Sequence, residues 1–352
     1  MDSNNVVVIA LKAKLAVLVL LALLTGCVAQ HKINSLAESL QAVGADATLA
    51  AVEKIKPNER DRAQYFLNRG TLYRLSGNLD SSTQDLESAK AIMRKLQASS
   101  VTENVAALTI NETLRSYSGT PSERVLLHTV LAYNYLQQND LDGARVEMLQ
   151  ADITMREVAD GDKLRGQLAS SHFLAGLIYE LNGEWDNAMI SYRNTAEILD
   201  QRGQPIPEAV QNSLLQTSFR QGLKEEYKKF SKRFSREAKP FSEGEKELIV
   251  FYSDGIVSHK RQQTISIYSF ELQQQITLSV PYYPSTNYYP RPLVLSIAGQ
   301  NLRTGMIEDL EVLARNDFKD EIPRITATTT ARVVAKYQLT EKCAESRATL
   351  WL

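Results

Sequence analysis

The sequence predicts an α+β fold that is mainly α: an N-terminal domain of repeated helical hairpins, then a small β-rich region and C-terminal helices. Three observations predict it. One pattern of large and small residues at helical spacing occurs three times between Phe66 and Ala196. After Pro240 the apolar spacing becomes strand-like, and helical spacing returns at Met306. The chain of 352 residues carries a formal net charge of −1, which gives no reason to expect a nucleic-acid partner.

The N-terminus has the pattern of a signal peptide. Lys12 and Lys14 precede an apolar run, Leu15–Leu24, that is too short to cross a bilayer as a helix. The run ends in Leu24, Thr25 and Gly26, followed by Cys27. This ending resembles the bacterial lipobox, and the resemblance implies that residues 1–26 are removed and that Cys27 is acylated, with chains such as palmitate. An uncleaved anchor, or a secreted protein with a chance cysteine, is the alternative.

Acylation of Cys27 has two consequences. Cys343 is the only other cysteine, so no intramolecular disulfide remains. Two or more acyl chains hold a protein stably on a membrane. Val28 follows Cys27, where Asp would resemble an inner-membrane retention signal. The resemblance to lipoproteins therefore favours the outer membrane, facing the periplasm, with the inner membrane and the cell surface as alternatives.

The repeated pattern has a bulky residue, a small residue four positions later, Tyr three positions after that, a turn, and a second helix that opens with a small residue. The three copies are Phe66, Gly70, Tyr73, Gly77, Leu79, Ser82, Leu86 and Ala89; His128, Ala132, Tyr135, Asn139, Leu141, Ala144, Met148 and Ala151; and His172, Gly176, Tyr179, Gly183, Trp185, Ala188, Tyr192 and Ala196. The pattern resembles tetratricopeptide repeats, and the resemblance implies stacked helical hairpins.

Each residue type in the repeat has a physical reason. A small residue is needed where the two helices of a hairpin cross at close range, which accounts for Gly70, Ala132 and Gly176. The tyrosines share a helix face with these small residues at three-residue spacing. The residue that ends the first helix adopts a left-handed conformation, which suits Gly77, Asn139 and Gly183.

The spacing of the copies is irregular. Tyr73 and Tyr135 are 62 residues apart and Tyr135 and Tyr179 are 44 apart, against about 34 in a regular array. We expect an extra helix at Val101–Tyr117 in the first gap and a longer hairpin around Gly161 in the second.

Further helices are expected on both sides of the repeats. One is Ile33–Ile55, broken at Gly44, and the other is Pro207–Phe234. The segment Ser122-Glu123-Arg124 has acidic charge in its first turn and is expected to start a helix. The resulting helical domain, residues 27–240, is expected to fold by itself because its contacts are local.

The remaining chain is expected to divide at residue 305. A hairpin is predicted at Glu247–Lys260 around the Asp254-Gly255 turn. Further strands are predicted at Thr264–Phe270, Gln275–Val280 and Pro292–Ala298, and the proline-rich stretch 281–290 is expected to be a loop or a sheet edge. Residues 306–352 hold the C-terminal helices: one at Met306–Phe318, a stop at Pro323, a second to about Tyr337, and a tail that is a candidate for truncation.

Three segments carry a wider resemblance. Residues 121–128, 252–256 and 309–315 together resemble one group of envelope lipoproteins of bacteria, which pair a tetratricopeptide-like half with a small β-containing region. The resemblance implies the same division of this chain and implies no established activity.

Few residues offer chemistry. The four histidines have no pair at the spacing of a zinc protease, so we expect no metal, no cofactor, no catalytic residue and no enzymatic activity. His128 and His172 occupy one repeat position, where packing is favoured over a shared metal or pH-sensing role. Tyrosine suits recognition, so Tyr282, Tyr283, Tyr288 and Tyr289 are candidates for ligand contact. The alternative is a loop that packs its rings over the sheet.

These observations predict a membrane-anchored envelope lipoprotein that acts as a protein-protein interaction scaffold or assembly factor. Stacked helical pairs build a surface that usually takes a peptide or a partner protein. The expected partners are the membrane, through the lipid, and an envelope protein or peptide. The alternative is a module that binds or modifies cell-wall glycan through the β-rich region.

Overall fold

The computed structural model describes residues 36–102, 116–159, 164–239, 246–270, 274–286, 288–297 and 299–349. The lipobox and Cys27 lie outside these ranges, and so do Gly161 and most of the helix expected at Val101–Tyr117.

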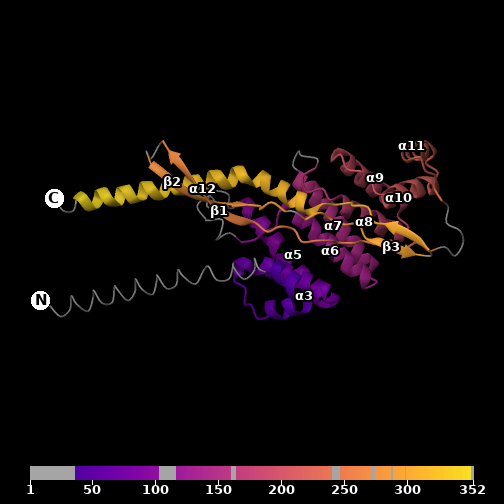
Figure 1. Ribbon diagram of the computed structural model, residues 1–352, viewed down its shortest axis with the longest axis horizontal. Coiled ribbons are helices and arrows are strands. Elements are labelled where there is room, and N and C mark those ends of the chain that lie inside the picture. The colour runs from indigo at the N-terminus through magenta and orange to yellow at the C-terminus, as the bar shows by residue number, and fades with distance from the viewer. Residues whose placement is uncertain are drawn as a thin grey trace.

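The predicted fold class is confirmed: helical pairs are followed by a small β region and a C-terminal helix (Figure 1). The helix α3 (Leu36–Val52) comes first and is interrupted at Gly44, where φ is 80°. Four pairs follow: α4 (Arg62–Leu75) with α5 (Leu79–Thr102), α6 (Pro121–Gln137) with α7 (Leu141–Ala159), α8 (Ala169–Leu181) with α9 (Trp185–Gln201), and α10 (Glu208–Arg220) with α11 (Lys224–Phe234).

The turns inside the pairs have the predicted left-handed residues. The φ angles are 80° at Gly77, 59° at Asn139 and 74° at Gly183. Gly222 (φ 68°) does the same between α10 and α11. The stretch Pro207–Phe234, which was expected to be a single helical stretch, is therefore a fourth helical pair.

The helix crossings lie where the small residues predicted them. A Cβ added to Gly176 would lie 2.3 Å from the Tyr192 ring of α9, and one added to Gly70 would lie 2.9 Å from Leu86 of α5. A Cβ at Gly176 would overlap the Tyr192 ring, and one at Gly70 would force the Leu86 side chain to shift, so both crossings favour glycine. One continuous core runs from α6 to α10 and includes Tyr192, Leu174 and Leu214.

The helix α6 starts as the acidic first turn predicted. Thr120 is the N-cap and forms a capping box with Glu123, and Pro121 occupies the first turn. The Thr120 side chain accepts from the Glu123 N–H, and the Thr120 N–H donates to Glu123 Oε2 at 2.7 Å.

The predicted hairpin at Glu247–Lys260 is wrong, because this stretch is extended but pairs with no strand among the described residues. The Asp254 carboxylate accepts the Arg291 N–H at 3.0 Å instead of closing a tight turn. The chain then forms two separate antiparallel hairpins. In the first, β1 (Arg261–Ser269) pairs with β2 (Gln274–Tyr282). In the second, β3 (Val294–Ile297) pairs with β4 (Gln300–Arg303), a short strand that the sequence pattern did not predict.

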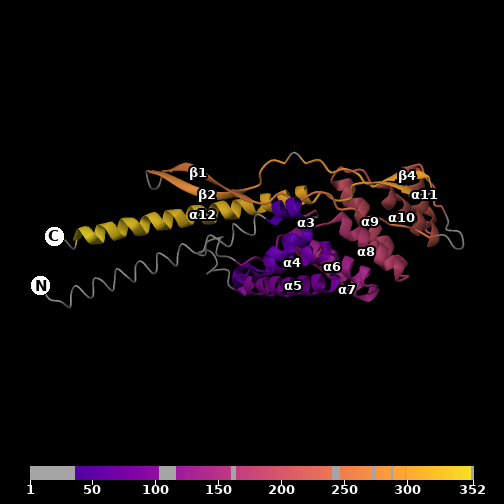
Figure 2. The same ribbon diagram turned by 60° about the horizontal axis from the view of Figure 1, so that its bottom comes forward.

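The helix α12 (Leu310–Thr349) runs through Pro323, so the predicted stop there is wrong. A proline inside a helix leaves the carbonyl four residues earlier without its N–H partner. Pro323 and Lys319 are both exposed, so water can satisfy that carbonyl. Ile276 and Leu278 of β2 are 1% exposed, and β2 packs along α12 (Figures 1 and 2). Within the ranges that the structure describes, no helix is both long and apolar enough to cross a membrane.

Candidate functional site

The first helices of the second and third pairs present aromatic rings on one shared face. Tyr133 of α6 follows Ala132, which is fully buried in the core, so its side chain points about 100° around the helix. Phe173 of α8 lies beside Tyr192, with ring centroids 5.8 Å apart. Positions four and eight residues later lie on the same side of each helix. We call this surface the α6–α8 face and define it by Tyr133, Gln137, Phe173, Leu177 and Leu181.

The extended residues 246–260 cross this face. The Phe251 ring lies between the two helices, with its centroid 5.2 Å from Tyr133 at an interplanar angle of 65° and 6.0 Å from Phe173 at 53°. Edge-to-face and tilted pairs at these separations are favourable beyond the area they bury. Since Phe251 contacts one ring from each helix, the segment passes over both α6 and α8. The face therefore accommodates an extended polypeptide through one aromatic anchor.

A cation borders the face on the α4 side. The Arg74 guanidinium lies 5.6 Å from the Tyr133 ring centroid. It donates to Asn134 Oδ1 at 2.5 Å and to Gln137 Oε1 at 2.9 Å. Burial lowers the pKa of Arg74 and raises the pKa of the Tyr133 hydroxyl. Both shifts arise because water is excluded from this part of the face.

Acidic charge lies at the other end. Glu180 of α8 accepts the Tyr192 hydroxyl at 2.6 Å. Burial, and then repulsion from Glu180, raises the pKa of Glu247 in the crossing segment.

The start of α12 is fixed to the helical pairs by buried polar contacts. Arg202 donates to Glu308 at 2.5 Å, and their side chains are only 15% and 6% exposed. Glu308 also accepts the Ser170 N–H at 3.2 Å. Asp317 accepts the Ser122 N–H at the start of α6 at 2.9 Å, and Leu313 belongs to the helical core.

The two repeat histidines are buried in helix packing. His128 Nδ1 lies 2.7 Å from Glu147 Oε2, and Lys90 donates to the other oxygen of Glu147 at 2.7 Å. Burial opposes ionisation of Glu147, but the hydrogen bonds from His128 and Lys90 lower its pKa. His172 lies 3.4 Å from Gln167 Oε1, and burial lowers the pKa of His172 to about 4. Each imidazole thus has its own polar partner.

The remaining predicted repeat residues lie inside or beside the pairs. Ala132, Ala144 and Ala188 are 0% exposed and Tyr179 is 7% exposed. The hydroxyl of Tyr73 donates to Glu53 at 2.6 Å, and that of Tyr135 donates to Glu87 at 3.3 Å. Tyr73 thus connects α4 to the turn that follows α3, and Tyr135 connects α6 to α5.

The structure separates the four tyrosines that were candidates for ligand contact. Tyr282 ends β2. Tyr283 packs edge-on against Phe318, 5.3 Å away, under the Arg315 guanidinium. The Tyr288 hydroxyl donates to Asp254, which raises the pKa of Tyr288 to about 12 and lowers that of Asp254. Tyr289 is 80% exposed. Tyr283 and Tyr288 therefore have intramolecular partners.

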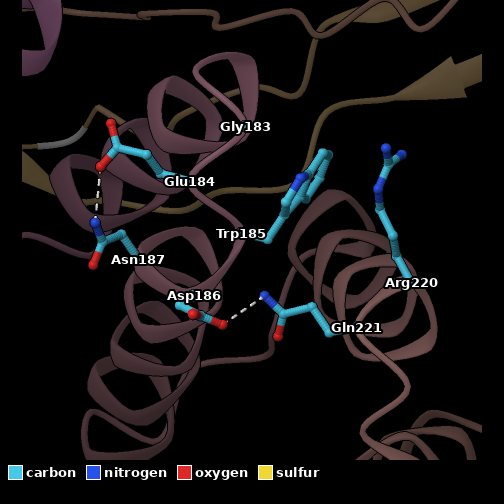
Figure 3. Close-up of a pocket in the computed structure, with 7 residues that line it drawn as sticks. All are labelled: Gly183, Glu184, Trp185, Asp186, Asn187, Arg220 and Gln221. Carbon is cyan, nitrogen blue, oxygen red and sulfur yellow. Dashed lines mark hydrogen bonds between the residues drawn. The ribbon is translucent and has the colours of Figure 1, made fainter.

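A shallow hollow of about 610 Å³ lies between the α8–α9 turn and the end of α10 (Figure 3). The Arg220 guanidinium lies 3.9 Å from the Trp185 ring centroid. Gln221 donates to Asp186 at 3.3 Å, and Asn187 donates to Glu184 at 2.8 Å. Most polar side chains that line the hollow therefore hydrogen-bond to other protein groups, and the Trp185 ring is the main surface left for a ligand.

Catalytic chemistry would need a cluster of titratable groups. Asp254 and Glu311 have separate partners: Asp254 bonds to Tyr288 and Arg291, whereas Glu311 accepts the Ser258 N–H at 2.6 Å and bonds to Arg315. Among the described residues, no group of three or more His, Cys, Asp or Glu could hold a metal ion.

Comparisons with known proteins identify no family. No family model matches the chain, and no curated protein matches it. Similar solved structures include MamA AMB-1, 16% identical, covering 58% of this chain and 88% of that one, with a TM-score of 0.38. BtubC from P. vanneervenii is 16% identical, covers 65% of this chain and 89% of that one, and has a TM-score of 0.40.

A third similar solved structure is a putative kinesin light chain from Podosopora anserina with nearly identical TPR-like repeats. It is 15% identical, covers 58% of this chain and 92% of that one, and has a TM-score of 0.39. At these TM-scores the assignment of the fold rests on the helical pairs themselves.

The α6–α8 face was not predicted. Tyr133 and Phe173 fall between the positions that define the repeat, so the pattern draws no attention to them. The one available signal was the apolar run Leu248–Tyr252, which was interpreted as a strand because Asp254-Gly255 follows it.

Proposed function

We propose that this protein is an envelope lipoprotein, held on a membrane through Cys27, and that it acts as a protein-interaction scaffold through the α6–α8 face. The helical pairs support the scaffold, since paired helices stacked in series commonly present a binding surface for a peptide. The lipobox resemblance supports the anchor.

The observation that carries the proposal is the packing of the Phe251 ring against Tyr133 and Phe173. It shows that this surface holds an extended chain by an aromatic side chain. Aromatic residues are enriched at protein interfaces relative to the rest of the surface. Tethering to a membrane would raise the effective concentration of any partner in the same envelope compartment.

Site-specific crosslinking in intact cells tests the proposal. A photoreactive residue is placed at Gln137 or Leu181 on the α6–α8 face, and at Val146 or Ile190 as controls. The controls lie on second helices and are both 51% exposed, compared with 67% for Leu181. We expect one envelope protein to be captured from the first pair of positions and not from the second. Equal capture from all four positions, or none from Gln137 and Leu181, would contradict the proposal.

Glycan binding, the alternative function, would need exposed aromatic rings in the β region. Tyr289 is one such residue and is 80% exposed. Co-sedimentation of the protein with purified cell wall, compared with a Tyr289→Ala variant, separates the two functions. Loss of sedimentation in the variant would favour glycan binding over the scaffold.

A further inference from the structure

Residues 246–260, here called the crossing segment, are held on the α6–α8 face by few interactions. The segment contains six large apolar residues, each at least 36% exposed: Leu248, Ile249, Phe251, Tyr252, Ile256 and Val257. Among the described residues, no backbone–backbone hydrogen bond joins the segment to a helix. Segments with little buried apolar surface and no backbone pairing open at low free-energy cost.

The attachments of the segment are unequal along its length. Its later part is fixed by polar contacts: Asp254 bonds to the Arg291 N–H, and the Ser258 N–H donates to Glu311 of α12. In its earlier part, the ring contacts of Phe251 with Tyr133 and Phe173 are the specific attachment that the described residues provide. The earlier part can therefore leave the face while the later part stays in place.

From these contacts we propose that the crossing segment occupies the α6–α8 face as an internal occupant, in the place of a binding partner. The binding partner is an extended peptide that displaces the crossing segment from this face. The partner peptide has an aromatic residue in the place of Phe251. This inference rests on the proposed function, because it names the kind of partner that the scaffold takes.

In the wild-type chain the crossing segment therefore competes with any added peptide for the α6–α8 face. A tethered segment acts at an effective concentration on the order of millimolar. A segment that binds with a Kd of about 0.1 mM would then weaken an added peptide about tenfold, because the free face is only fractionally populated. Removing the Phe251 anchor should restore most of that affinity.

The test uses a fluorescent synthetic peptide with the sequence of residues 246–260 and the purified full-length chain in detergent. Peptide binding is followed by anisotropy for the wild type, for Phe251→Ala, and for the neighbouring control Tyr252→Ala. We expect the peptide to bind Phe251→Ala about tenfold more tightly than the wild type or the control. A peptide carrying Phe251→Ala should lose binding.

A second measurement needs no variant of the protein. The peptide is N-methylated at the amides that follow Phe251 and Tyr252, so that chymotrypsin does not cleave it. At saturation it should speed chymotrypsin cleavage of the wild-type chain after Phe251 or Tyr252, since displacement releases these residues from the face. Equal peptide affinity for all three chains, or unchanged cleavage under saturating peptide, would overturn the internal-occupant proposal.

The two proposals fail separately. Crosslinks from Gln137 and Leu181 in cells without peptide binding would leave the scaffold in place and refute the inferred peptide chemistry. Peptide binding without any crosslink in cells would refute the scaffold and leave the face as an intramolecular docking surface. A bound peptide whose affinity is unchanged by Phe251→Ala in its own sequence would refute the aromatic anchor.

Discussion

His172 should make the stability of the protein depend on pH in a range where few carboxylates titrate. Its side chain is 5% exposed, and burial lowers its pKa from the ordinary 6.5 to about 4. The unfolded chain therefore binds a proton below pH 6.5 that the folded chain does not bind until about pH 4. Stability is complete above pH 6.5 and is lost as the pH falls toward 4.

The magnitude follows from the two pKa values. Integrating the difference in bound protons from pH 7 to pH 5 gives a loss of about 2 kcal/mol from this one group. Burial is the largest cause of the shift, while Asp152 opposes it and Arg156 reinforces it. The loss is therefore attributed mainly to desolvation of the imidazole.

The assay is urea denaturation of the wild type, His172→Gln and His172→Leu at pH 7, 6 and 5. Each variant will carry its own pH-independent change in stability, so the comparison is of slopes. We expect the wild type to lose about 2 kcal/mol more than either variant between pH 7 and pH 5. Parallel profiles for the three proteins would refute a buried neutral His172.

Two further predictions concern the helix crossing and the anchor. Gly176→Leu should lower the free energy of unfolding by about 1–3 kcal/mol through overpacking against Tyr192, whereas Ala91→Leu at an exposed helix position should change it little; equal midpoints in urea would count against the crossing. Gly166 is a poor control, because it has φ 65° and an added Cβ would lie 2.2 Å from Val158. Cys27→Ser should leave an unacylated precursor; recovery of the mature wild-type protein in water without detergent would show that the lipid is absent.

The sequence predicted the parts of the fold that are decided locally. Asn139 and Gly183 were identified because a helix that ends in a left-handed residue favours Asn or Gly. Gly70 and Gly176 were identified because a close helix crossing needs a small residue. In each case the reason lies within about twenty residues of chain, and the structure confirms it.

The rest depends on contacts between distant residues, which leave no periodic pattern. The apolar run Leu248–Tyr252 has the composition of a strand, but Phe251 packs on helices more than seventy residues away. Pro323 was expected to stop a helix, yet in α12 its position is exposed and the interruption is tolerated. The α6–α8 face was missed for the same reason, since it becomes a site only when α6, α8 and the crossing segment come together.

The Arg202–Glu308 pair alters the expected independence of the helical half. Its partners are 106 positions apart in the chain and both nearly buried. Removing one partner of such a pair typically costs about 3–5 kcal/mol, because the other charge remains buried. In the wild type we therefore expect trypsin to leave a core that retains residues 308–318, where Leu313 and Asp317 add to the attachment. Arg202→Met should release the start of α12 and shift the stable product toward Lys239, as mass spectrometry of the fragments would show. A wild-type product that already ends near Lys239 would mean that residues 36–239 hold together without α12, as the sequence alone led us to expect.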